Sequence, residues 1–106
     1  MRNPSPSLRH LLGLIPDRIP VCLWADLDYG GFNILSQFRQ FIRSDVQTCF
    51  MDIPTFEAHA SLSRPLTQKD QRNLKRLALR PELKDVRPVI DHLLERGLKL
   101  EQEAIG

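Results

Sequence analysis

The chain has 106 residues, and its 15 lysines and arginines against 13 aspartates and glutamates give a formal net charge of +2. This length supports one domain, and 42 % apolar with 26 % charged residues is typical of a folded protein and excludes an intrinsically disordered one. The longest apolar run, residues 21–25, is too short for a transmembrane helix, and we expect no membrane partner. The first seven residues lack the apolar core of a signal peptide and the two cysteines fit no disulfide framework, so a cytoplasmic protein is expected.

The first half of the chain predicts a strand, a helix and a second strand. Before them, a loose arm leads into a short helix that Ser7 caps. Residues 21–25 form a continuous apolar run, which indicates a strand covered on both faces, as in a parallel sheet. A helix with one apolar face is predicted over residues 32–43, and a second strand over residues 46–51. This order predicts a βαβ unit with adjacent parallel strands.

The second half of the chain predicts helices. We expect a short helix that Thr55 caps and that runs to Ala60, and a longer helix at 68–79. A third helix is expected at 82–96, with a bend at Pro88. Thr67 is the expected cap of the 68–79 helix, and Gly97 the expected left-handed end of the 82–96 helix. The predicted fold class is therefore α/β: a βαβ unit with parallel strands followed by a helical C-terminal half, in a single domain of residues 1–106.

The sharpest chemical signal is a pair of carboxylates, Asp26 and Asp28, which follow the first predicted strand. Residues i and i+2 of an extended chain point the same way, so the two carboxylates converge and repel unless a cation lies between them. Mg²⁺ prefers oxygen ligands and often takes one or two carboxylates. Capping of the following helix is the alternative role. Asp52 follows the second strand at the same sheet edge, where it faces DNA, supports the pair or caps the next helix.

Two sequence motifs resemble one protein family. Residues 24–35, Trp-Ala-Asp-Leu-Asp-Tyr-Gly-Gly-Phe-Asn-Ile-Leu, resemble the Trp-Gly-Asp-(Ile/Leu)-Asp-x-x-Gly-(Phe/Leu)-x-Ile-Leu stretch of the JetD nuclease subunit of the bacterial Wadjet plasmid-defence system. Residues 98–106, Leu-Lys-Leu-Glu-Gln-Glu-Ala-Ile-Gly, resemble that family's C-terminal Leu-x-Leu-Glu-Gln-Glu-x-Ile-Gly. Ala25 replaces the family's usual glycine, a small residue for a small one. The two motifs stand in the family's order and bracket residues 24–106.

The resemblance implies a function as well as a fold. The family's C-terminal domain is a Toprim domain related to the A subunit of topoisomerase VI, which implies DNA cleavage that depends on Mg²⁺ or Mn²⁺. By this resemblance Asp26 and Asp28 are the metal ligands, and Glu101 and Glu103 are further catalytic acids. The implied partners are DNA and a condensin-like complex of the defence system, and a homodimer is left open.

A Toprim site also uses a glutamate on a strand that precedes the Asp-x-Asp strand. The residues before Val21 contain no glutamate and no strand pattern. We therefore expect the C-terminal portion of a Toprim domain, without its first acidic strand. A non-catalytic module that docks on DNA or protein remains the alternative to a nuclease. A phosphatase of the haloacid dehalogenase type is disfavoured, because there the second aspartate is followed by Gly and then Thr or Ser, whereas Tyr29 follows here.

A basic segment is the other functional candidate. Residues 61–80 carry six basic residues and one acidic residue. Four of the basic residues follow helical spacing and share one predicted face: Lys69, Arg72, Arg76 and Arg80. A stripe that binds nucleic-acid phosphates and a solvated helix face both fit this pattern. We expect His59 to be packed or at the surface and not to belong to a site.

Overall fold

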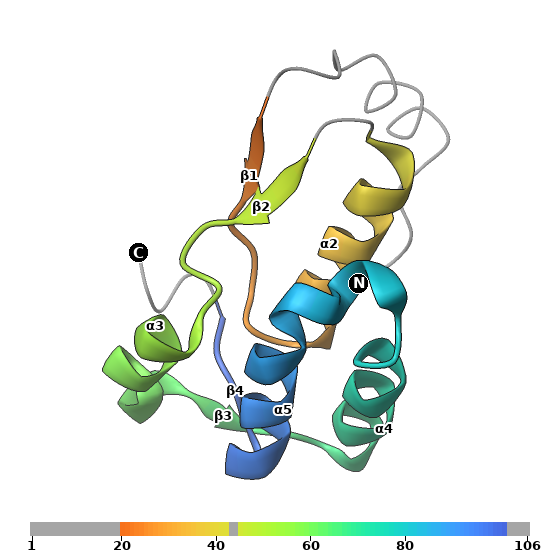
Figure 1. The fold of residues 1–106 in the computed structure, drawn as a ribbon. Coiled ribbons are helices and arrows are strands. Elements are labelled where there is room, and N and C mark those ends of the chain that lie inside the picture. The colour runs from red at the N-terminus through yellow and green to blue at the C-terminus, as the bar shows by residue number, and fades with distance from the viewer. Residues whose placement is uncertain (1–19, 43–44, 102–106) are drawn as a thin grey trace.

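The computed structural model describes residues 20–42 and 45–101 (Figure 1). The helix predicted after Ser7, and Glu103, lie outside these residues. The helices and strands in chain order are β1 (Val21–Leu23), α2 (Tyr29–Phe41), β2 (Val46–Thr48), α3 (Ile53–Ala58), η1 (Ala60–Leu62), β3 (Arg64–Pro65), α4 (Gln68–Leu77), η2 (Pro81–Val86), α5 (Arg87–Arg96) and β4 (Leu98–Lys99), where η marks a 3₁₀ helix.

The predicted βαβ unit is confirmed. Strands β1 and β2 pair in parallel, in a register that runs from Val21 opposite Val46 to Leu23 opposite Thr48. Helix α2 lies beside this pair (Figure 1). Both strands are shorter than predicted. The expectation that the first strand is covered on both faces is wrong, because Cys22 in the middle of β1 is exposed. Phe50 adopts φ 59°, a left-handed conformation that cannot continue a strand, so β2 ends before it.

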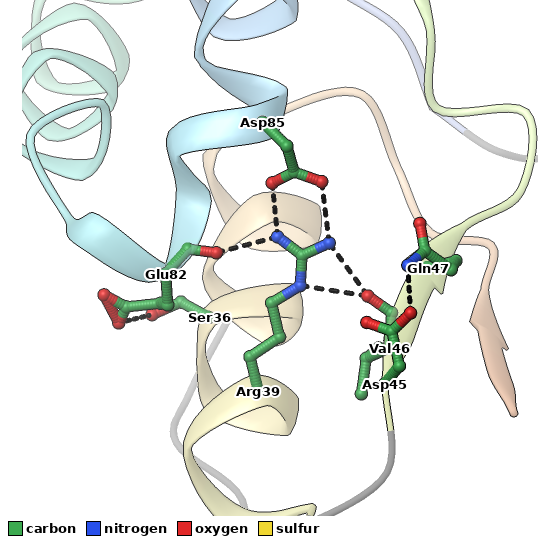
Figure 2. Close-up of polar contacts among 7 residues, drawn as sticks. All are labelled: Ser36, Arg39, Asp45, Val46, Gln47, Glu82 and Asp85. Atoms are coloured by element: carbon green, nitrogen blue, oxygen red, sulfur yellow. Dashed lines mark hydrogen bonds and ion pairs between the residues drawn. The ribbon is translucent and has the colours of Figure 1, made fainter. Parts of the chain in front are cut away.

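Arg39 of α2 ties the βαβ unit to η2 (Figure 2). Its Nε and Nη2 atoms donate to the carbonyl oxygen of Val46, at 3.0 and 2.8 Å. Its Nη1 atom donates to the carbonyl oxygen of Glu82 at 2.7 Å. The guanidinium also forms a bidentate ion pair with the Asp85 carboxylate, at 2.6 and 3.0 Å. One side chain of α2 thus fixes the position of β2 on one side and of η2 on the other.

The last predicted helix, residues 82–96, is interrupted. The bend expected at Pro88 is a full break between two helices, η2 and α5. Pro88 stands in the first turn of α5, where its missing N–H donor is not needed. The capping box of α4 is as predicted: Thr67 Oγ1 accepts from the Asp70 amide at 3.0 Å, and Asp70 Oδ2 accepts from the Thr67 amide at 2.9 Å. Gly97 ends α5 at φ 67°, also as predicted.

The C-terminal segment forms strand pairs that the helical prediction did not include. Strand β4 pairs antiparallel with β3, and the next residue, Leu100, forms an antiparallel bridge with Leu27. Leu27 and Leu100 are both fully buried and belong to one core together with Phe32, Phe56 and Ile90. Burial of each such side chain stabilises the fold by about 1.5–3 kcal/mol. Within the described ranges, no helix is long and apolar enough to cross a membrane.

Candidate metal and nucleic-acid site

Asp26 and Asp28 lie on the segment that connects β1 to α2. Burial alternates along this segment: Ala25 and Leu27 are buried, whereas Asp26 and Asp28 are half-buried and Trp24 is exposed. The alternation is that of an extended chain, in which every second side chain faces the same way. The two carboxylates therefore share one outward face.

Asp28 also caps α2. Its Oδ1 atom accepts a hydrogen bond from the Gly31 amide at 2.8 Å. Burial raises the pKa of the Asp28 carboxyl above its usual value and the negative charge of Asp26 adds to the rise, while the Gly31 amide and the charge of Lys99 oppose it. A carboxylate has about four acceptor positions, so one capping bond leaves capacity for another ligand. The capping and metal-binding roles of Asp28 are compatible.

Gly31 allows the Asp26 backbone to lie directly against the first turn of α2. A Cβ atom on Gly31 would stand 1.8 Å from the Asp26 carbonyl oxygen, far inside van der Waals contact. The second glycine of the pair after Tyr29 is therefore required by this close approach. The contact fixes the position of the Asp26 backbone relative to the first turn of α2.

The bridge between Leu27 and Leu100 brings Glu101 next to this segment. The Leu27 amide donates to the Leu100 carbonyl at 2.8 Å, and the Leu100 amide donates to the Leu27 carbonyl at 3.1 Å. In an antiparallel pair this register places Glu101 opposite Asp26 and Lys99 opposite Asp28.

Lys99 adds a positive charge beside the acids. Its Nζ atom lies 2.9 Å from Asp70 Oδ2, which ties β4 to the first turn of α4. Burial raises the pKa of Asp70, but hydrogen bonds from Lys99 and Thr67 outweigh it, so the pKa is held below its usual value. Because Lys99 also attracts Asp28, it partly offsets the repulsion within the acidic pair.

Asp26 and Asp28 supply some, but not all, of the ligands that a divalent cation takes from protein. Two carboxylates on one face supply oxygen ligands of the kind that Mg²⁺ takes, and their mutual repulsion is what a cation would relieve. Across residues 20–42 and 45–101, no group of three or more His, Cys, Asp and Glu side chains is arranged to hold a metal. Glu101 is exposed, and it is placed near the pair by the register of its backbone opposite Asp26.

Asp52 caps a helix, which is one of the three roles considered for it. Its Oδ1 atom accepts from the Thr55 amide at 2.8 Å, so Asp52 caps α3. The expectation that Thr55 caps the short helix is therefore wrong: the cap is Asp52, and Thr55 lies inside the first turn of α3. The Nδ1 atom of His59 lies 3.0 Å from the Thr55 carbonyl oxygen, at the end of the same helix.

The four basic residues do not form one exposed face. Lys69, Arg72 and Arg76 are exposed on α4. The helix ends at Leu77, two residues earlier than predicted, and Arg80 lies beyond it. Arg80 Nη1 donates to Ser36 Oγ on α2 at 3.0 Å, so its guanidinium is held against the neighbouring helix.

An aromatic cavity lies at the same ends of β1 and β2, and the sequence interpretation did not include it. Trp24 and Phe50 follow the two strands, with 37 % and 55 % of each residue exposed, and their rings meet edge to face at 5.8 Å between centroids. With residues of α3 and His59 they line a cavity of about 520 Å³. The available signal was the position of the two aromatic residues just after two adjacent parallel strands.

A family model described as Wadjet protein JetD, C-terminal, matches residues 8–106. The chain belongs to this family. The resemblance inferred from the two motifs is therefore confirmed, and the family is that of a subunit of a multi-subunit Wadjet defence complex. Searches of curated proteins and of solved structures each returned no match.

The two motifs of this JetD-family chain meet in space. Residues 24–35 hold Leu27, and residues 98–106 hold Leu100, so the bridge between the two leucines joins the motifs directly. Asp26 and Glu101 therefore lie on adjacent extended segments although they stand far apart in the sequence.

Proposed function

We propose that this chain is part of a DNA-cleaving subunit of the Toprim type in a Wadjet complex, and that its cleavage depends on Mg²⁺ or Mn²⁺. The observation that supports this most is the register of the Leu27–Leu100 bridge, which groups Asp26, Asp28 and Glu101 at one edge. Membership of the JetD family agrees with it.

Each residue has a distinct role in this proposal. Asp26 and Asp28 hold the cation, and the capping bond from Gly31 orients Asp28. A cation held by these two carboxylates would supply positive charge to offset the charge that develops on a phosphate under attack. Glu101 adds negative charge to the same edge. Glu103, which lies outside the described residues, is the second C-terminal acid of the proposal.

DNA phosphates contact the exposed basic residues of α4 in this proposal. Lys69, Arg72 and Arg76 point their charges to solvent along one helix. Each phosphate contact releases counterions, which makes binding strongly dependent on salt concentration. Arg80 instead positions α4 against Ser36 of α2.

A second candidate is a docking module without chemistry of its own. The observation in its favour is that the described segments hold no three-ligand group for a metal. Such a module would bind DNA or another subunit through α4 and leave the acids as helix caps and solvated residues.

Plasmid nicking separates the two candidates. The Wadjet complex that contains this chain is assayed with Mg²⁺, beside an Asp26→Asn variant and an Asp52→Asn control, since asparagine still caps α3. We expect cleavage to be lost with Asp26→Asn and retained with Asp52→Asn. Full cleavage by the Asp26→Asn complex would exclude Asp26 as a ligand and favour the docking module.

A further inference from the structure

We infer that the cavity between Trp24, Phe50 and α3 binds an unpaired nucleobase of the DNA strand whose phosphate lies at Asp26 and Asp28. The inference rests on the proposed function, since it assigns the base that accompanies the phosphate at that site. It adds a binding subsite with its own residues and its own chemistry.

The lining of the cavity suits a flat aromatic ligand. Trp24 and Phe50 are among the most exposed large apolar residues of the described chain. Their rings meet edge to face and not as a parallel stack, so ring faces remain on which a flat ligand can stack. A base that stacks on an aromatic side chain gains roughly 5- to 150-fold in affinity. The volume, about 520 Å³, lies within the range of small-molecule sites.

Phe50 is held in a costly conformation that does not bury its ring. Its φ of 59° is rare for a bulky residue, and 55 % of the residue remains exposed. Backbone strain of this kind persists only where the surroundings enforce it, and it is concentrated at ligand-binding sites. Packing in the core therefore does not explain why the ring of Phe50 stands beside Trp24.

His59 is the polar ring among the residues that line the cavity. Its Nδ1 atom is 3.0 Å from the Thr55 carbonyl oxygen, which only accepts, so Nδ1 carries the proton. In the neutral ring this tautomer leaves Nε2 as an acceptor. Adenine, cytosine and guanine each present an exocyclic amino group that donates to such an atom. The cavity thus combines a stacking surface with one polar contact.

One residue of the cavity lining, Trp24, lies close to the acidic pair along the chain. Trp24 precedes Asp26 by two residues on the same outward face, a separation of about 7 Å in an extended segment. This is on the order of one nucleotide step along an extended DNA strand. A phosphate at the acids and a base on Trp24 then belong to the same or to neighbouring nucleotides, which favours DNA over a peptide as the occupant.

The fluorescence of Trp24, the only tryptophan of the chain, tests the inference directly. The 106-residue chain is titrated in EDTA with single-stranded oligo(dA) and with an abasic oligonucleotide of the same length. We expect saturable quenching by oligo(dA), and at least tenfold weaker binding of the abasic strand. Equal binding of both strands, or no quenching, would overturn the inference.

Matched variants locate the effect in the cavity. Phe50→Ala should weaken oligo(dA) binding by roughly 5- to 150-fold. Ala58→Leu, which fills the cavity and keeps both aromatic rings, should weaken it as well. Leu79→Ala is the control, because Leu79 is 75 % exposed and does not line the cavity. Unchanged affinity in both cavity variants would contradict a base at this position.

Two further outcomes separate this inference from its competitors. The Asp26→Asn variant should still show quenching by oligo(dA) in EDTA, because stacking needs no metal. The quenching result therefore does not depend on whether Asp26 is a metal ligand. A Trp24 signal that changes with protein concentration in the absence of DNA would assign the cavity to contact with a second copy of the chain, and would overturn the nucleobase.

Discussion

Leu27 and Leu100 exchange both of their backbone hydrogen bonds, at 2.8 and 3.1 Å, and both side chains are fully buried. This single bridge joins the segment that carries Asp26 and Asp28 to the segment that carries Glu101. The buried leucines face the core, so the acids that alternate with them face outward. The chemistry proposed for the chain depends on this register.

Gly31→Ala should destabilise the fold strongly. The added Cβ atom would meet the Asp26 carbonyl oxygen at 1.8 Å, and backbone atoms on both sides would have to move. We expect a loss of about 3 kcal/mol or more in the free energy of unfolding, at the upper end of overpacking effects. Urea denaturation measures it.

Gly97→Ala is the matched control for that change. Gly97 has φ 67° but nothing within 4 Å of an added Cβ atom, so only conformational strain of about 1–2 kcal/mol is expected. If Gly31→Ala were no more destabilising than Gly97→Ala, the close packing of Asp26 on α2 would be wrong.

Acid should weaken the contact between α2 and η2. Hydrogen bonds from Arg39 hold the pKa of Asp85 below its usual value. Because the folded pKa lies below the unfolded one, the stabilisation is complete above the unfolded pKa, about 4, and is lost as the pH falls through the folded value. Denaturation at a series of pH values from 6 to 2 measures the slope.

Asp85→Asn provides the comparison for the acid series. The variant has no carboxylate to protonate at this position, so its stability should fall less steeply below pH 4 than that of the unchanged chain. Identical slopes for the two proteins would show that the Arg39–Asp85 pair does not contribute.

The exposed basic residues of α4 and Arg80 should differ in their effect on DNA binding. If Lys69 and Arg72 contact DNA phosphates, Lys69→Ala or Arg72→Ala should lower the slope of log affinity against log salt by about one. Arg80→Ala should leave that slope unchanged and lower the stability, because it removes the donor to Ser36. Salt-independent DNA affinity would leave the α4 residues as a solvated face.

Local signals explain why part of this fold was predictable. The apolar run after Pro20 and the amphipathic segment after Gly31 predicted the parallel pair and its helix, since apolar periodicity is a local signal. The burial of the first strand was overestimated, because Cys22 is exposed. Thr67 and Gly97 predicted helix ends because capping and the left-handed conformation depend on single residue types.

Long-range and compensating features were not predictable in the same way. Nothing near Leu27 or Leu100 in the sequence indicates that they pair, because that register is set by packing of the whole core. Asp26 and Asp28 stood out as a chemical pair, but the exposed rings of Trp24 and Phe50 read as ordinary strand residues. The conformation of Phe50 became visible only in the structure.

Titration of the chain with Mn²⁺ tests the central claim, that Asp26 and Asp28 hold a divalent cation, most directly. Asp28→Asn keeps an N-cap residue on α2 and removes one charge, and Asp52→Asn does the same on α3 as the control. We predict that Asp26→Asn and Asp28→Asn each weaken Mn²⁺ binding at least tenfold, while Asp52→Asn leaves it unchanged. Mn²⁺ binding of equal strength in all three variants would contradict the claim.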